Sequence, residues 1–94
     1  MRTIERSTTF KRDYKRVKAT PQHKADIDFA IEAILFLLLN DQPLPISARD
    51  HKLTGDWAGY RDCHIKPDLV LIYARPEPAT LRLVRLGSHS ELFG

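Results

Sequence analysis

The spacing of apolar residues near the start of the chain predicts a short strand followed by a helix. Residues 2–5 have an extended character, and a Ser or Thr at positions 7–9 can supply the oxygen that caps a helix N-terminus. Phe10, Tyr14 and Val17 then fall at i, i+4 and i+7, which places them on one face of the helix. This helix is expected to be apolar toward the core and polar elsewhere.

A longer pattern predicts a second helix from about Gln22 to Asn40. Pro21 separates it from the first helix, and Pro43 ends it because proline lacks a backbone donor and restricts the residue before it. The apolar residues at helical spacing are Ile27, Ala30, Ile31, Ile34, Leu35 and Leu38. Positions 34–39 are apolar almost all round, so we expect this half of the helix to be buried.

The second half of the chain has the pattern of strands. Residues 43–58 form a connector, and strands are predicted at about 59–65, 69–74 and 80–87, separated by turns that contain proline. Positions 69–73 are apolar throughout, as expected of a central strand covered on both faces. The predicted fold is α+β: a short N-terminal strand, two helices, a three-strand antiparallel meander on which the helices pack, and a short C-terminal tail.

Length and composition predict one folded domain over residues 1–94. The chain is 43% hydrophobic and 29% charged, which is a globular rather than a disordered composition. The lone cysteine, Cys63, has no partner for an internal disulfide and faces opposite His64 if the strand alternates, which marks it as a packing residue. The longest apolar run, 33–39, is far shorter than the roughly 20 residues that cross a bilayer, and no signal-peptide core precedes it, so we expect a cytoplasmic protein.

Positive charge is concentrated at the start of the chain. The net charge is +3, but residues 1–24 hold eight Lys or Arg against two acidic residues, so this segment carries +6 and the rest −3. Such a basic segment is typical of a phosphate-rich partner, although a solvated helix face without a partner gives the same pattern. The basic residues of the first predicted helix are Lys11, Arg12, Lys15, Arg16 and Lys18.

Three of the four histidines lie between Asp50 and Gly94. His51, His64 and His89 can exchange protons near neutral pH, since the unperturbed pKa of histidine is roughly 6.5. An arginine in the same stretch, Arg85, suits a phosphate group. RNA carries its own nucleophile, the 2′-hydroxyl, so a general base, a general acid and a cation suffice to cleave it, with no metal or cofactor required.

Each of these residues also has a purely structural interpretation. His64 could lie on a solvated strand face, and His51 could bond to a neighbouring carbonyl. Arg85 extends the alternating row that begins at Leu81 and could form a surface salt bridge with Asp62 or Glu91. Asp68 follows Pro67, where it is a common turn residue. The fourth histidine, His23, has no predicted role.

Several segments in the second half of the chain occur in a specific order. They are Asp50–Leu53, Gly55–His64, Pro67–Tyr73, Arg85–His89 and Leu92–Gly94. This ordered set resembles the YafQ branch of the RelE/ParE toxin superfamily, and the order of the preceding helices matches as well. The resemblance covers nearly the whole chain. It departs at Leu69, where the family often has tryptophan.

The resemblance implies a bacterial type II toxin with a RelE-like fold. Such a toxin is a ribosome-dependent endoribonuclease, an mRNA interferase, that cuts mRNA in the ribosomal A site and is inhibited by a cognate antitoxin. The basic first helix would then contact ribosomal RNA. The catalytic or mRNA-contacting positions that map onto this chain are His51, Asp62, His64, Asp68, Arg85, His89 and Phe93.

Roles for these residues follow from the implied reaction. His51 would be the general base and His89 the general acid, or the reverse, with His64 and Asp68 orienting them or sharing a proton. Arg85 would neutralise the scissile phosphate. Asp62 and Phe93 would bind the substrate, Phe93 by stacking on a base or alternatively by pinning the tail to the core.

Three alternatives compete with this interpretation. A ParE-like gyrase inhibitor would share the fold but gives no reason for three histidines to accompany Arg85. A non-catalytic ribosome-binding or RNA-binding module would need only the basic helix. A metal site built from the three histidines and Asp68 lacks the short ligand spacing typical of such sites.

Overall fold

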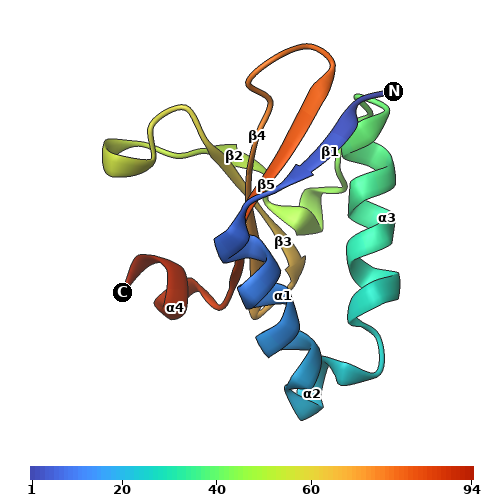
Figure 1. The fold of residues 1–94 in the computed structure, drawn as a ribbon, viewed down its shortest axis with the longest axis vertical. Helices are drawn as coiled ribbons and strands as arrows, with labels where there is room; N and C mark the ends of the chain where they lie inside the picture. The colour runs from blue at the N-terminus through green and yellow to red at the C-terminus, as the bar shows by residue number, and fades with distance from the viewer.

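The computed structural model describes all 94 residues, Met1–Gly94, and has an α+β fold (Figure 1). In chain order the elements are β1 (Thr3–Arg6), α1 (Thr8–Ala19), α2 (Pro21–Lys24), α3 (Ile27–Leu39), the 3-10 helix η1 (Ile46–Ala48), β2 (His51–Lys52), the 3-10 helix η2 (Gly55–Trp57), β3 (Arg61–Lys66), β4 (Leu69–Ala74), β5 (Thr80–Gly87) and α4 (His89–Phe93). None of the helices combines the length and the apolar composition needed to cross a bilayer.

The five strands form one mixed sheet in the order β1-β5-β4-β3-β2. β1 runs parallel to β5, whereas the pairs β5–β4, β4–β3 and β3–β2 are antiparallel. The predicted meander is therefore confirmed. All six residues of β4 are buried, which confirms the prediction of a central strand covered on both faces.

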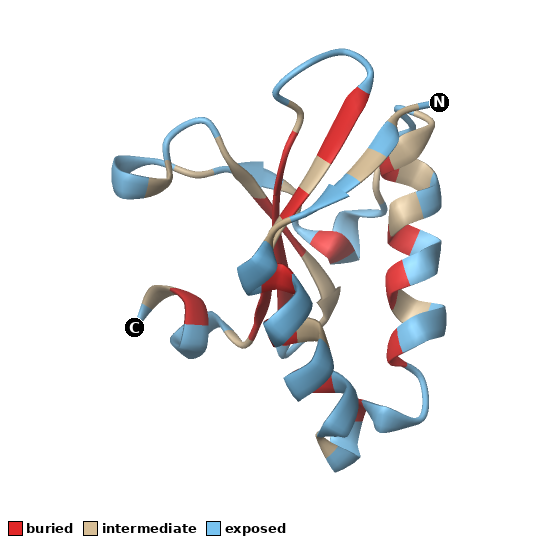
Figure 2. Ribbon diagram, viewed as in Figure 1, coloured by how far each residue is buried: buried red, intermediate tan, exposed pale blue.

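The two faces of the sheet carry different layers (Figure 1). On one face, the main core joins residues of α1 and α3, such as Phe10 and Leu38, to alternate sheet residues such as Leu71 and Leu83. Figure 2 shows that the buried positions of α3 lie toward the sheet and its exposed positions away from it. The other face has a smaller cluster in which α4 contributes Leu92. The sheet alternation thus creates two separate surfaces.

The prediction of a single long helix over residues 22–40 is wrong. The helix breaks at Ala25 and Asp26, so that α2 continues the turn after α1 and α3 starts afresh at Ile27. The break lets the chain reverse direction and return along the sheet (Figure 1). Asp26, a residue type favoured at helix N-caps, was the sequence signal for this boundary.

The prediction that positions 34–39 are buried on all sides of the helix is also wrong. Ile34 and Leu38 are buried, but Phe36 is 63% exposed, because α3 lies on the surface and turns only one face to the sheet. Phe29, two turns earlier on the same side of this helix, is exposed as well.

Two further elements were not predicted. The short strand β2 lies within the predicted connector and adds a fifth strand, while β3 begins two residues later than expected. The C-terminal tail forms α4, which starts with a capping box: Ser88 Oγ accepts from the Glu91 N–H, and Glu91 Oε1 accepts from the Ser88 N–H. The Ser-x-x-Glu spacing at 88–91 was the signal for this helix.

The contrast between Leu38 and Phe36 gives a test of the helix orientation. We expect Leu38→Ala to lower the free energy of unfolding by about 2–5 kcal/mol, because Leu38 is fully buried and its loss leaves a cavity. Phe36→Ala should change it by less than about 0.5 kcal/mol. Urea denaturation followed by circular dichroism measures both, and equal losses would contradict this placement of α3.

Candidate active site

A lateral row of residues crosses four strands on the sheet face that carries α4. His51 of β2 lies opposite Asp62 of β3, Asp62 lies opposite Ile72 of β4, and Ile72 lies opposite Arg85 of β5. Directly paired residues point to the same face of a sheet. The row therefore brings three of the candidate residues onto one surface, away from α1 and α3.

The next row along the sheet accounts for the positions of the other two candidate histidines, His64 and His89. His64 pairs with Val70, and Val70 pairs with Gly87, so His64 shares the face of Asp62. Gly87 ends β5, and Ser88 then starts α4 with His89 as its first residue. The antiparallel meander thus gathers residues that are far apart in the sequence.

Arg85 reaches this face because of an irregularity in β5. Tyr73 pairs with Leu83 but Ile72 pairs with Arg85, so Val84 is an extra residue between the two pairs. The predicted continuation of the row from Leu81 to Arg85 is therefore wrong. The inserted residue acts as a β-bulge and moves Arg85 to the opposite face from Leu83.

A hollow of about 290 Å³ lies on this surface. Its lining residues are His51, Leu53, Thr54, Trp57, Asp62, His89 and Phe93. His51 and His89 are exposed to solvent, whereas Asp62 is buried. The structure therefore brings two candidate proton carriers and one buried carboxylate to the same opening.

The hydrogen bonding of His51 defines its tautomer. Its Nδ1 atom lies 2.8 Å from the carbonyl oxygen of Arg49. A carbonyl oxygen only accepts, so Nδ1 carries the hydrogen and donates it, and the neutral ring has its lone pair on Nε2. Arg49 has a left-handed backbone with φ of 48°, uncommon for a residue other than glycine. His51 is thus held in the form of a proton acceptor.

Asp62 is a buried carboxylate, and few hydrogen bonds or opposite charges offset the cost of burying it. Its Oδ1 atom lies 3.1 Å from His51 Nδ1 but has no hydrogen bond of good geometry. Burial raises the pKa of Asp62, and the nearby His51, His64 and His89 oppose that rise only in part. An ionised group in such a position costs stability, which is a common property of functional sites.

Arg85 has a buried ion-pair partner that the sequence did not indicate. Its Nε donates to Asp13 Oδ2 at 2.7 Å, so the alternative of a surface salt bridge with Asp62 or Glu91 is wrong. This hydrogen bond to the Asp13 carboxylate raises the pKa of Arg85. Arg85 does not line the hollow of His51 and His89, although it lies on the same face of the sheet.

The structure places Asp68 apart from this hollow. Asp68 lies in the turn between β3 and β4, where its Oδ2 accepts from Gln22 Nε2 and lies 3.9 Å from His23 Nε2. It lines a second hollow together with His23, a buried residue that also receives a contact from Lys66 Nζ at 3.2 Å. His64 turns its Nδ1 toward the carbonyl of Pro67 at 3.3 Å.

The basic residues of α1 divide into two groups. Lys11, Arg12 and Lys15 are exposed and make no ion pair, and Lys18 pairs with Asp28 at the surface. Arg16 instead donates to Asp13 at 2.8 Å and to the carbonyl of Leu86 at 3.1 Å. Arg16 therefore links α1 to β5 within the protein.

Three further positions have structural roles. Leu69 is buried in the main core, where no base could stack on it. Cys63 also lies in that core, and burial raises the pKa of its thiol, which confirms the prediction of a packing residue. Trp57 packs edge-on against Tyr60 and Phe93, with ring centroids 5.4 and 6.5 Å apart.

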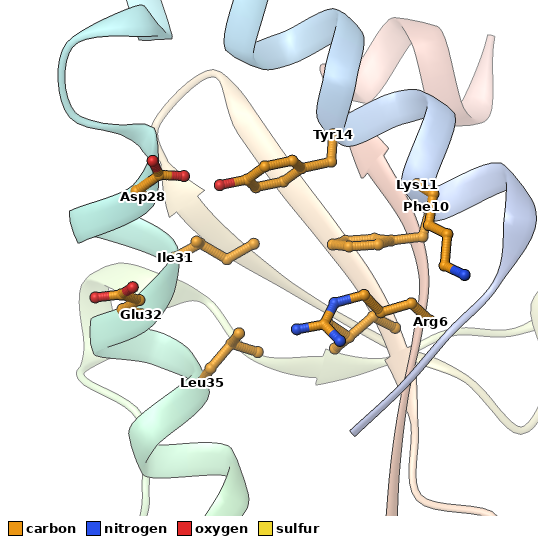
Figure 3. Close-up of a pocket in the computed structure, with 9 residues that line it drawn as sticks. Arg6, Phe10, Lys11, Tyr14, Asp28, Ile31, Glu32 and Leu35 are labelled. Carbon is orange, nitrogen blue, oxygen red and sulfur yellow. The ribbon is translucent and has the colours of Figure 1, made fainter. Parts of the chain in front are cut away.

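A separate groove of about 350 Å³ runs between α1 and α3 (Figure 3). Phe10 and Tyr14 point into it from α1, and Ile31 and Leu35 from α3. Leu83 of β5 and charged residues of both signs complete the lining; the charged residues are Arg6, Lys11, Asp28 and Glu32. No histidine lines this groove, so it is distinct from the acid–base surface. No three His, Cys, Asp or Glu side chains converge as a potential metal site anywhere in the structure.

The environment of Asp62 predicts a gain in stability when its charge is removed. Its pKa in the folded state lies above the ordinary value of 3.8, so the folded state binds more protons and stability falls as the pH rises through this window. Asp62→Asn should therefore have a higher thermal midpoint than the wild type at neutral pH and a flatter pH dependence above about pH 4. Thermal melts across this range measure the effect.

Asp56→Asn is the matched control, since Asp56 is exposed on the neighbouring η2. Its melting curve should match that of the wild type. A lower midpoint for Asp62→Asn at neutral pH would show that Asp62 stabilises the fold.

Comparison with known proteins identifies the family. Residues 2–94 match the family model described as bacterial toxin of type II toxin-antitoxin system, YafQ. The chain is 41% identical over 93 residues to the mRNA interferase toxin YafQ of Escherichia coli K12, which covers 99% of this chain and 97% of that protein.

Solved structures give the same result. The crystal structure of YafQ from E. coli BL21(DE3) superposes with a TM-score of 0.84 at 37% identity, covering 100% of both chains. YafQ in the E. coli DinJ-YafQ toxin-antitoxin complex gives 0.82 at 38% identity, covering 99% of this chain and 98% of that one. These matches confirm the expected RelE-like α+β fold and the resemblance. The chain belongs to the YafQ family of toxins from type II toxin-antitoxin systems.

Proposed function

We propose that this chain is an mRNA interferase, an endoribonuclease that cleaves mRNA on the ribosome and so inhibits translation. Its E. coli relative at 41% identity is named an mRNA interferase toxin, and the histidine surface accounts for that chemistry here. The observation that carries the proposal is that His51 and His89 open onto one hollow from two different elements, β2 and α4. A gyrase inhibitor is not favoured by these relatives.

The proposed reaction uses the RNA's own 2′-hydroxyl as the nucleophile. His51 Nε2 removes the proton, and the 2′ oxygen attacks the adjacent phosphorus while the bond from phosphorus to the 5′ oxygen breaks. His89 donates a proton to that leaving oxygen, so the products are a cyclic phosphate and a 5′-hydroxyl. The tautomer of His51 supports its assignment as the base, because Nδ1 is engaged with Arg49.

Arg85 supplies the positive charge that the phosphate needs in the transition state. Its guanidinium is only partly buried, so it can meet an RNA strand laid along this face of the sheet. His64, one row further along, orients the reacting groups or shares a proton with Asp68. The hydrogen bond from Gln22 occupies Asp68 Oδ2, which leaves Oδ1 for that part.

Asp62 and Phe93 complete the proposed substrate site. Asp62 lies beside His51 and holds the imidazolium that forms when the base takes its proton. Phe93 keeps part of its ring exposed while it packs on Trp57 and His89, so a flat RNA base can stack on it.

The proposed partners are the ribosome with its mRNA and a cognate antitoxin. The exposed basic residues of α1 support contact with ribosomal RNA, because phosphate neutralisation supplies most non-specific affinity. The antitoxin is supported by the E. coli relative, which is seen in complex with DinJ. We place the action of this toxin in the cytoplasm, with residues 1–94 acting as one domain.

His89→Gln tests the role of the general acid. We expect cleavage of ribosome-bound mRNA to fall by about 10²- to 10⁴-fold with the fold unchanged, because glutamine cannot donate a proton to the leaving oxygen. Mapping mRNA ends on ribosomes measures cleavage, and Ser90→Ala, at the next position of α4, is the control that should cleave normally.

The same assay against pH separates base from acid. His89→Gln should remove the fall in rate at alkaline pH, and His51→Gln the fall at acidic pH. Wild-type cleavage by His89→Gln would exclude His89 as the acid, and would favour a non-catalytic ribosome-binding module if His51→Gln also cleaved normally.

Charge reversal on α1 tests the ribosome contact. Arg12→Glu combined with Lys15→Glu should weaken ribosome binding and reduce the salt slope of the logarithmic affinity by about 2, because two phosphate contacts are lost. Both side chains are exposed, so thermal stability should not change. Lys24→Glu on α2 is the control for a single reversed charge away from α1, and unchanged binding by the double variant would refute the contact.

A further inference from the structure

Asp13 is the single acidic residue of α1, and it is buried. Its surroundings in the sequence are basic, yet only 2% of the residue is exposed. A buried carboxylate costs stability unless hydrogen bonds and opposite charges compensate it. Asp13 therefore has a defined set of partners.

Those partners are two arginines and one backbone amide. Arg85 donates to Oδ2 from Nε at 2.7 Å and to Oδ1 from Nη2 at 3.3 Å. Arg16 donates to Oδ1 at 2.8 Å, and the N–H of Leu86 donates to Oδ2 at 3.0 Å. The contact with Arg85 is two-pronged, and such a contact fixes the orientation of the guanidinium plane as well as its position.

The contact lies where β5 loses its neighbouring strand. β1 pairs with β5 only as far as Leu83, so the backbone of Leu86 faces an open edge. Asp13 accepts from the Leu86 N–H, and Arg16 donates to the Leu86 carbonyl, so the two side chains substitute for a strand. Arg85 lies next to this edge and can therefore reach α1 from the opposite face of the sheet.

Asp13 remains charged under ordinary conditions. Burial on its own would raise the pKa of Asp13, but the hydrogen bonds from Arg85, the Leu86 amide and Arg16 outweigh it and lower the pKa below its usual value. The ion pair with Arg85 is thus present at neutral pH.

We propose that Asp13 is a positioning residue for the RNA-cleaving reaction, acting through Arg85. Asp13 does not lie in the hollow of His51 and His89 and does not touch the substrate itself. It holds the Arg85 guanidinium at one place and in one plane beside the sheet face on which the phosphate would lie. This inference rests on the proposed function, in which Arg85 neutralises that phosphate. Loss of Asp13 then lowers turnover more than substrate affinity, because misplaced charge is felt mainly in the transition state.

The test is Asp13→Asn, compared with Asp41→Asn. Asp41 also lies near two arginines, Arg2 at 2.9 Å and Arg75 at 3.8 Å, but it is exposed and outside the proposed site. We expect Asp13→Asn to lower kcat for cleavage of ribosome-bound mRNA by about 10- to 100-fold with KM nearly unchanged. Asp41→Asn should cleave like the wild type.

A double variant separates positioning from general stability. In an Arg85→Ala background, Asp13→Asn should cause almost no further loss of kcat, since its effect passes through Arg85. Circular dichroism and thermal melts verify that each variant is folded. If Asp13→Asn is too unstable to assay, Asp13→Glu keeps the charge and shifts the carboxylate by one methylene. The proposal then requires the same lower kcat, and no further loss in the Arg85→Ala background.

The outcomes distinguish this inference from the proposed function. If Arg85→Ala alone leaves cleavage unchanged, the role of Arg85 fails and the inference fails with it. If Arg85→Ala lowers cleavage but Asp13→Asn does not, or if the two losses simply multiply, only the positioning role of Asp13 is refuted.

Discussion

The burial of β4 on both faces is the constraint on which the rest of the structure depends. Leu69, Leu71 and Tyr73 pack under the helices, while Val70 and Ile72 pack on the other side. A slip of one residue would exchange these two sets, which differ in size and shape, so their packing in the two layers fixes the register of β4 with both neighbouring strands. Those neighbours carry Asp62 and His64 on one side and Arg85 on the other. The hydrophobic core therefore sets the spacing of the proposed chemistry.

The two buried aspartates show opposite solutions to the same electrostatic problem. Asp13 receives hydrogen bonds from two arginines and a backbone amide, so its ionised form is stabilised. Asp62 lacks a hydrogen-bond donor for Oδ1, and burial disfavours its charge. One carboxylate thus serves the framework, whereas the other is held in an unfavourable state beside an exposed histidine. Strained groups of this kind persist where the surrounding fold fixes them.

The sequence pattern predicted the elements better than it predicted the contacts. The apolar run of β4 and the alternating Cys63 and His64 indicated the sheet and its two faces, because burial follows a period of two along a strand. The helix break at Asp26 and the capping box at Ser88 left local signals that a closer reading of the sequence could use. Contacts between distant segments leave no such local signal.

The site illustrates that limit. Arg85 and Asp13 are 72 positions apart, and nothing near either residue indicates their ion pair. Asp68, in the turn between β3 and β4, accepts a hydrogen bond from Gln22 of α2, which is 46 positions away in the sequence. The exposure of Phe36 likewise follows from how α3 lies on the sheet, because composition alone cannot distinguish a surface helix from a buried one.

The extra residue Val84 gives β5 one position more than strict alternation would place between its core residues Leu83 and Leu86. Leu83 and Leu86 belong to the core face, and the two positions between them accommodate Val84 and Arg85 on the other side. Removing Val84 would restore strict alternation, with Leu83 and Leu86 still on the core face and the arginine between them still on the other face. Relatives that lack this extra residue should therefore keep the two leucines and the arginine on the same faces, because the deletion removes only the bulge.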